Sequence, residues 1–141
     1  MKLTLSAVLG VALLTAACAD PVVPATPTPV LGTISETFSD TLLVLGTNTH
    51  TFTVQQIGSL KVSITSATPT VAIGLGVGTP SIGSCAVVEK VTVVPSAQAS
   101  TVTPAVNLSG TASLAGPFCV LVYDVGNLTE SIAYTVNVLH S

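Results

Sequence analysis

The chain has 141 residues and very few charges, with three basic side chains, six acidic ones and a formal net charge of −3 at pH 7. Nucleic-acid binding requires a basic surface that displaces counterions from phosphates, and so few cations cannot form one, which excludes this class of partner. At 48% hydrophobic residues the chain is also too apolar for intrinsic disorder. It is long enough for one domain with a single core, and a second domain does not fit.

The first residues have the layout of a secretory signal peptide. Lys2 supplies a cation, an apolar run follows as far as Leu14, and small residues come next. The apolar run is shorter than the roughly 20 helical residues that cross a bilayer, so a retained transmembrane helix is not expected. We assign the signal to residues 1–17 and expect it to be removed.

The end of this signal resembles the lipobox of bacterial lipoproteins, in which small residues precede a cysteine. Here Thr15-Ala16-Ala17 precede Cys18. In that family the cysteine receives a diacylglyceryl group and becomes the new N-terminus, so the resemblance implies lipidation of Cys18 and a stable membrane anchor. Ala19 follows it in place of aspartate, which resembles lipoproteins sent to the outer membrane of a two-membrane cell. The alternative is cleavage after the A-x-A site at 17–19, which gives a secreted or periplasmic protein without the cysteine.

Residues 18–31 are predicted to form a tether. Four prolines lie within residues 21–29, a density that favours polyproline II at about 3.1 Å per residue. The expected role of this linker is to lift a domain off the lipid surface.

Residues 32–141 are predicted to form an all-β domain, an antiparallel β-sandwich of about eight strands. Their β-branched side chains favour strands over helices. Residues 51–54 and 59–65 alternate apolar and polar side chains, and the short segment 56–58 between them predicts a hairpin. In residues 71–77 the alternation places large apolar side chains on one face. The other face is nearly bare, because it carries only an alanine and two glycines. Further strands are expected at residues 86–94, 102–108, 111–114, 118–123 and 132–139.

Cys85 and Cys119 are left as an even pair once Cys18 belongs to the signal or carries the lipid. In an oxidising compartment such a pair predicts a disulfide. A metal site needs four converging ligands, and two isolated cysteines with two distant histidines lack that spacing, so neither a metal nor a cofactor is expected.

The most polar stretch of the domain is residues 123–130. Asp124, Asn127 and Glu130 carry oxygen atoms of the kind that calcium prefers. A turn is the simpler interpretation, because Asp and Asn side chains bond to their own backbone and Gly126 permits a positive φ. The segment would then close a hairpin between the last two strands.

Three glycines at positions 74, 76 and 78 alternate with apolar residues. They do not form a phosphate-binding loop, because no Lys-Ser/Thr follows them and no helix is expected there. Glycines at alternate strand positions instead let a neighbouring backbone or a ligand approach closely, so tight packing and a contact surface are both open. Neither His50 nor His140 stands near a plausible nucleophile in sequence, and we assign no catalytic residue.

From about Asn48 onward, the order of features resembles the bacterial pre-peptidase C-terminal domain, a small β-sandwich found on secreted proteins. The resemblance rests on the apolar segment 51–65 around Gly58, on Ala115-Gly116 leading into the strand at 118–123, and on the terminal segment 133–138. It implies a jelly-roll-like sandwich and a non-catalytic accessory role.

Together these observations predict a non-enzymatic, lipid-anchored module of the bacterial cell envelope, with a protein or a glycan as its ligand. Two other functions stay open. A structural or adhesive protein would assemble through exposed strand edges, and a large exposed apolar patch would favour it. A secreted hydrolase would gather His50 with an acid or a serine in a concave pocket.

Overall fold

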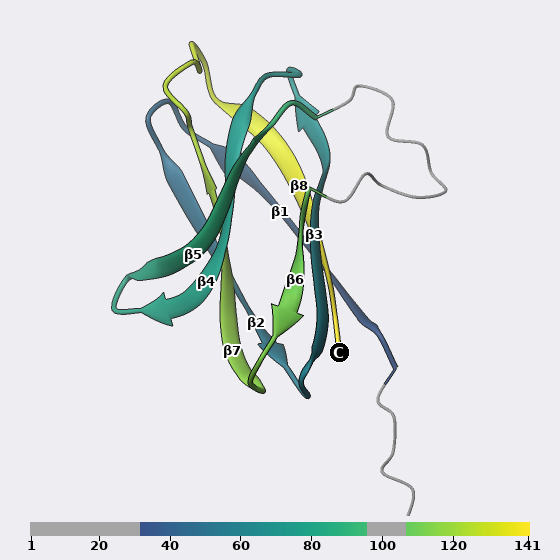
Figure 1. The fold of residues 1–141 in the computed structure, drawn as a ribbon. Helices are drawn as coiled ribbons and strands as arrows, with labels where there is room; N and C mark the ends of the chain where they lie inside the picture. Colours follow the sequence, from purple (N-terminus) through teal and green to yellow (C-terminus); the bar gives the residue numbers. More distant parts are fainter. Residues whose placement is uncertain (1–31, 96–106) are drawn as a thin grey trace, which may run out of the picture.

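Two four-stranded antiparallel sheets make up the part of the chain that the computed structural model describes, residues 32–95 and 107–141 (Figure 1). The strands are β1 (Ile34–Leu42), β2 (Thr47–Val54), β3 (Gly58–Thr68), β4 (Ile73–Ser81), β5 (Ser84–Val93), β6 (Leu108–Ala112), β7 (Gly116–Tyr123) and β8 (Ile132–His140). The sheet orders are β1-β8-β3-β6 and β2-β7-β4-β5, which together are those of an eight-stranded jelly roll. The predicted all-β sandwich is confirmed.

The signal, Cys18 and the proline-rich tether lie outside the described residues. Within the described ranges, no helix is long and apolar enough to cross a membrane.

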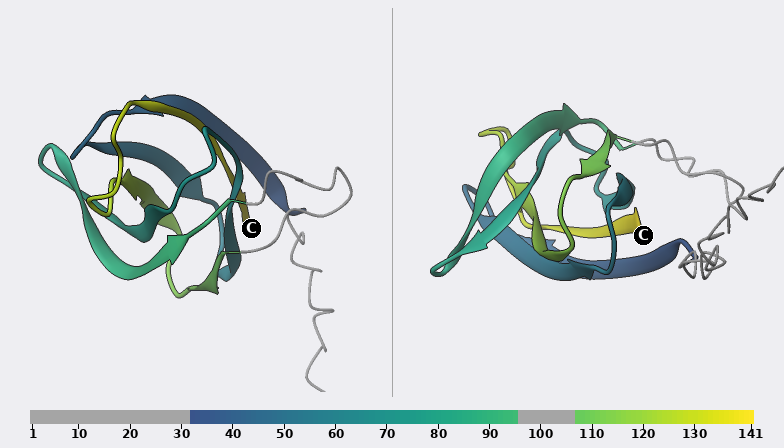
Figure 2. Two further views of the ribbon diagram at one scale, coloured as in Figure 1. Left: turned by 90° about the horizontal axis from the view of Figure 1, so that it is seen from above. Right: turned by 60° about the horizontal axis from the view of Figure 1, so that its bottom comes forward.

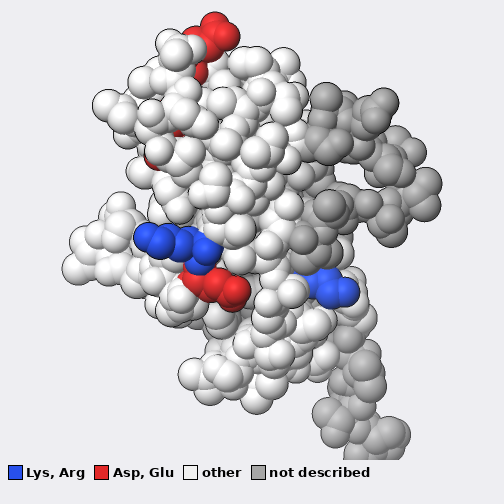
Figure 3. Space-filling view, turned by 45° about the horizontal axis from the view of Figure 1, so that its top comes forward, with Lys and Arg blue, Asp and Glu red and all other residues white. Residues whose placement is uncertain are grey.

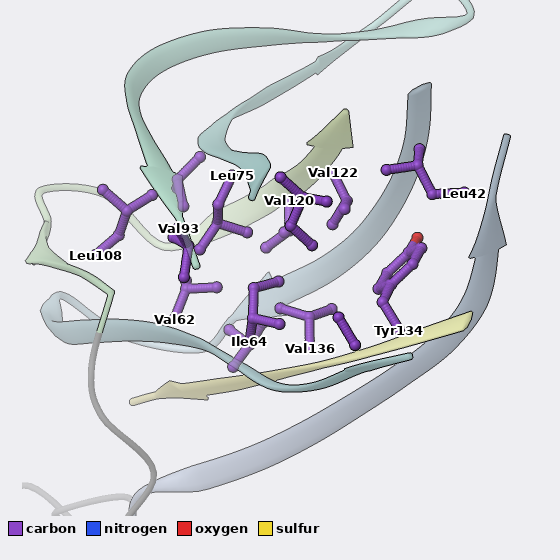
Figure 4. Packing of buried hydrophobic residues seen from close by; sticks show 14 of the residues in the cluster. Leu42, Val62, Ile64, Leu75, Val93, Leu108, Val120, Val122, Tyr134 and Val136 are labelled. Atoms are coloured by element: carbon purple, nitrogen blue, oxygen red, sulfur yellow. The ribbon is translucent and has the colours of Figure 1, made fainter. Parts of the chain in front are cut away.

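The two sheets curve around a common interior, as the view from above shows (Figure 2). Alternation along each strand decides which side chains enter that interior. In β8, for example, Tyr134, Val136 and Val138 are buried and the residues between them are partly exposed. Side chains from β3 and β8 face side chains from the other sheet in Figure 4, including Val62, Ile64, Val136, Leu75, Val93, Val120 and Val122. Burial of these apolar faces is the main force that holds the two sheets together.

The predicted hairpin of residues 51–54 with 59–65 is wrong. β2 pairs with β7, whereas β3 pairs with β6 and β8 in the other sheet. Residues 55–57 therefore cross between the sheets. Alternation shows which face of a strand is apolar, but it does not show which strand is the neighbour, and two apolar faces can meet across a core as well as side by side. For the same reason the segment between β7 and β8 is a crossing between sheets and not the predicted hairpin.

β1 has no counterpart among the predicted strands. Its sequence alternates, but the acidic residues Glu36 and Asp40 fall in the same alternating row as Phe38 and Leu42, and they interrupt the apolar row that marks a strand in sequence. The strand predicted at 111–114 is observed as β6, which begins three residues earlier, at Leu108. Most of the strand predicted at 102–108 lies outside the described residues.

The glycines of β4 allow close approach to neighbouring strands. Gly74 pairs with Tyr123 of β7, and the tyrosine ring occupies the place where a Cβ on Gly74 would lie. At Gly78 the same space is filled by the backbone carbonyl of Ala86 in β5. The nearly bare face therefore serves packing, one of the two interpretations that the sequence left open.

Gly78→Ala is expected to lower the free energy of unfolding by about 1–3 kcal/mol, because the added methyl group overlaps a backbone carbonyl that cannot rotate away. Urea unfolding of the disulfide-bonded protein measures this loss. The matched control is Gly110→Ala on β6, where an added Cβ meets nothing within 4 Å; its effect should be neutral or slightly stabilising. Equal losses in the two variants would contradict the close approach at Gly78.

Candidate functional site

A disulfide joins Cys85 of β5 to Cys119 of β7, although β4 lies between these strands in the sheet. The two Cα atoms are 5.9 Å apart, whereas strands on either side of a third strand in a flat sheet are separated by about 9.5 Å. β5 must therefore fold back over β4, and it does so where the pairing register shifts between Val77 and Gly78. The structure thus contains the predicted disulfide, and Gly78 provides the space for it.

Replacing both cysteines, as Cys85→Ser with Cys119→Ser, should lower the free energy of unfolding by about 3–4 kcal/mol, because the bond closes a long loop in the unfolded chain. Denaturant unfolding of the double variant measures this loss. The wild-type protein under reducing conditions is the control and should unfold with the variant. An unchanged unfolding midpoint in the double variant would show that the bond does not hold the fold.

His50 lies where β1 and β2, an edge strand of each sheet, meet along one side of the sandwich. We call this side the closed seam and define it by Glu36, Phe38, His50, Tyr134 and His140. His50 Nε2 is 2.7 Å from the Tyr134 hydroxyl oxygen, and the His50 ring stacks on Phe38 with ring centroids 5.0 Å apart. Burial lowers the pKa of His50, and the nearby charge of Asp40 opposes this in part. Burial also raises the pKa of Tyr134 to about 12.

The second histidine occupies the other end of the closed seam. His140 is only 1% exposed, and its Nε2 atom lies 2.9 Å from a carboxylate oxygen of Glu36. Its ring also packs against Phe52. The fold therefore brings together side chains that are isolated in sequence, and it uses both histidines to join β1 to its neighbours. Glu36, an acid on the partly buried face of β1, was the sequence signal for the contact with His140.

Replacing His50 is expected to change how stability depends on pH. Its pKa in the folded state lies below the ordinary value of 6.5, so the unfolded chain takes up the proton more readily and stability falls as pH drops below that value. In His50→Gln, which keeps a hydrogen-bonding side chain beside Tyr134, the free energy of unfolding should fall less between about pH 7 and about pH 5. Urea unfolding across this range tests the expectation, and parallel curves for variant and wild type would contradict it.

The polar segment after β7 is organised by Asp124. One oxygen, Oδ1, accepts hydrogen bonds from the backbone N–H groups of Gly126, Asn127 and Leu128 at 2.8, 3.1 and 3.3 Å. Oδ2 accepts one from Leu45 N–H at 2.8 Å. Partial burial tends to raise the pKa of Asp124, but the four N–H donors outweigh it and the pKa is lowered.

These contacts match the turn interpretation, and Gly126 has the expected positive φ of 93°. The calcium interpretation gains no support, because both carboxylate oxygens of Asp124 already accept backbone hydrogen bonds. Nor do the described ranges contain a cluster of three or more His, Cys, Asp or Glu side chains that could hold a metal ion.

A groove runs between β5 and β6, the edge strands on the side opposite the closed seam. It consists of two adjoining cavities of about 150 and 480 Å³ that share Val88, Thr111 and Phe118. The described residues that line the larger cavity are apolar, glycine or hydroxyl-bearing, and none of them is ionisable: Gly78, Thr79, Val88, Thr111, Ser113, Leu114, Ala115, Gly116, Pro117 and Phe118. Glu89 lines the smaller cavity only. Both cavities are half open to solvent, and their lining is mostly apolar.

No protein-family model matches this chain, and no curated protein matches it either. The resemblances to bacterial lipoproteins and to the pre-peptidase C-terminal domain therefore stay predictions.

Proposed function

We propose that this chain is a non-enzymatic binding or accessory module of the bacterial cell envelope. The groove between β5 and β6 carries this proposal, because the lining of its larger cavity offers apolar contact, hydroxyl groups and backbone atoms to a ligand. Such a lining can contact a neutral protein segment or a glycan. Among its described residues it offers no ionisable side chain that could accept or donate a proton in a reaction. The histidine that a hydrolase would need, His50, lies in the closed seam on the other side of the sandwich, in contact with Phe38 and Tyr134.

Lipid anchoring through Cys18 is the second part of the proposal. The signal sequence, the lipobox-like residues and the disulfide all fit an exported protein, since structural disulfides persist in oxidising compartments. Thirteen residues, 19–31, separate Cys18 from the described domain, and at about 3.1 Å each they would reach roughly 40 Å. In a cell with two membranes we place the anchor in the outer membrane.

Assembly through strand edges is the competing function, and two features of β5 weigh against it. Glu89 and Lys90 place charges on this edge strand, and the register shift opposite Val77 and Gly78 leaves Val88 without a partner. Charges and bulges are the usual devices that prevent an edge from pairing with another chain. We therefore favour ligand binding over edge-to-edge assembly.

The anchor is tested by the intact mass of the protein taken from the membrane fraction. We expect a mature N-terminus at Cys18 with the added mass of acyl chains. Cys18→Ser should lose the acyl mass and leave the membrane fraction. A mature chain that starts at Asp20 without lipid would contradict the anchor and indicate a secreted or periplasmic protein.

The groove is tested by comparing two exposed aliphatic residues. Leu114 lines the larger cavity and Ile57 lies in the loop between β2 and β3, outside the lining of both cavities; they are 71% and 64% exposed. Binding to cell-wall glycan and to envelope proteins is measured with wild-type protein, Leu114→Glu and Ile57→Glu. A carboxylate placed in an apolar site should weaken binding by roughly tenfold or more, and only in Leu114→Glu. Equal binding by the two variants would exclude the groove as the site.

A further inference from the structure

Four exposed aliphatic side chains gather at the end of the sandwich where the β1–β2 and β7–β8 loops lie, at the top of Figure 1. We call them the apolar tip: Leu43, Val44 and Leu45 in the first loop and Val125 in the second, which are 63, 46, 79 and 38% exposed. Asp124 N–H donates to the Gly46 carbonyl oxygen at 3.0 Å, and Leu45 N–H donates to the Asp124 carboxylate. The two loops therefore form one connected surface.

Leu45 adopts a backbone conformation that favours glycine. Its φ is 55°, and the hydrogen bond from Gly46 N–H to the Leu43 carbonyl oxygen, at 2.8 Å, closes the turn around it. A positive φ at this place in a turn is normally taken by glycine or asparagine, because a larger side chain destabilises it. Leu45 gains no compensating burial, since it is the most exposed residue of the tip. The leucine thus costs the fold stability, and backbone strain of this kind clusters at functional sites such as ligand clamps.

The apolar tip is also held in place before any partner arrives. The Asp124 carboxylate accepts four backbone hydrogen bonds, one of them from Leu45 and the others from its own loop. A surface that is already ordered loses less conformational freedom on binding than a flexible one. The arrangement therefore favours a specific docking contact.

The charges near the apolar tip indicate which kind of partner it can bind. Asp40, Asp124 and Glu130 lie at this end of the domain, whereas the two lysines of the described part lie elsewhere, Lys61 near the start of β3 and Lys90 in the middle of β5. Figure 3 shows acidic side chains at the upper end, and both lysines below them together with a further acidic side chain. Such a surface repels anionic lipid headgroups and also repels the tip of a second copy. It complements a cationic surface.

We propose that the apolar tip docks into a protein partner whose apolar pocket is bordered by lysine or arginine side chains. The proposal deepens the binding role given above and rests on the proposed anchor for the orientation of the tip, but it does not use the groove. β1 begins at the opposite end of the domain (Figure 1), so a tether attached there leaves the tip facing away from the anchored end. The module would thereby hold its partner at a distance from its own membrane.

The test is photo-crosslinking of the full-length protein in its native envelope. A benzoylphenylalanine probe at position 44 should capture one protein, and the crosslinked peptide of that protein should contain lysine or arginine beside apolar residues. Adding Leu45→Gly to the same chain should abolish the crosslink without lowering the thermal unfolding midpoint, because glycine suits the turn. With the purified partner, Leu45→Gly should weaken binding on the order of tenfold or more, and binding should weaken as salt rises.

The control probe is placed at Ile57, an exposed aliphatic position in the β2–β3 loop, and should not capture the same protein. Leu114→Glu in the groove should leave the position-44 crosslink intact, so failure of the groove and failure of the tip are distinguishable. The proposal is overturned by capture of a second copy of this chain, by the same product from position 57, or by a crosslink that survives Leu45→Gly. Binding of the protein to phosphatidylcholine–phosphatidylglycerol vesicles that Leu45→Gly abolishes would overturn it in favour of a membrane contact.

Discussion

The fold of β5 over β4 is the constraint on which the rest of this structure depends. Only a residue without a side chain fits beneath the Ala86 carbonyl, and Gly78 is that residue. Because β5 folds back there, Cys85 reaches Cys119 across the intervening strand. The same fold shapes the groove, since Gly78 and the unpaired Val88 both line its larger cavity. A glycine, a bulge and a disulfide thus define one open side of the sandwich.

The opposite side of the sandwich is closed by polar contacts. Along the closed seam, Glu36 and His140 form one pair and His50 and Tyr134 form another, with aromatic rings packed between them. Inward polar side chains are tolerated there because each finds a partner, whereas the centre of the interior is apolar. The domain is therefore asymmetric, with a joined edge on one side, a groove on the other and an exposed apolar tip at one end.

Local patterns predicted much of this architecture. Alternation located β3, β7 and β8, and the leftover cysteine pair predicted the disulfide. The partners of the strands could not be predicted, because an apolar face looks the same in sequence whether it meets a neighbour in its own sheet or a strand across the core. β1 was missed because Glu36 and Asp40 interrupt its apolar row, and the partner of Glu36, His140, lies about a hundred residues further along the chain. The strained turn at Leu45 also left no signal, since a leucine at a glycine position looks like any apolar residue.

Non-reducing peptide mapping of the protein isolated from its native envelope tests whether β5 folds back over β4. We expect one peptide pair that joins Cys85 to Cys119, because the folded hairpin brings these two cysteines together and export exposes them to an oxidising compartment. Cys18 should be absent from every disulfide-linked pair. Free thiols at positions 85 and 119, or a bond from either of them to Cys18, would contradict both the fold of β5 over β4 and the groove that depends on it.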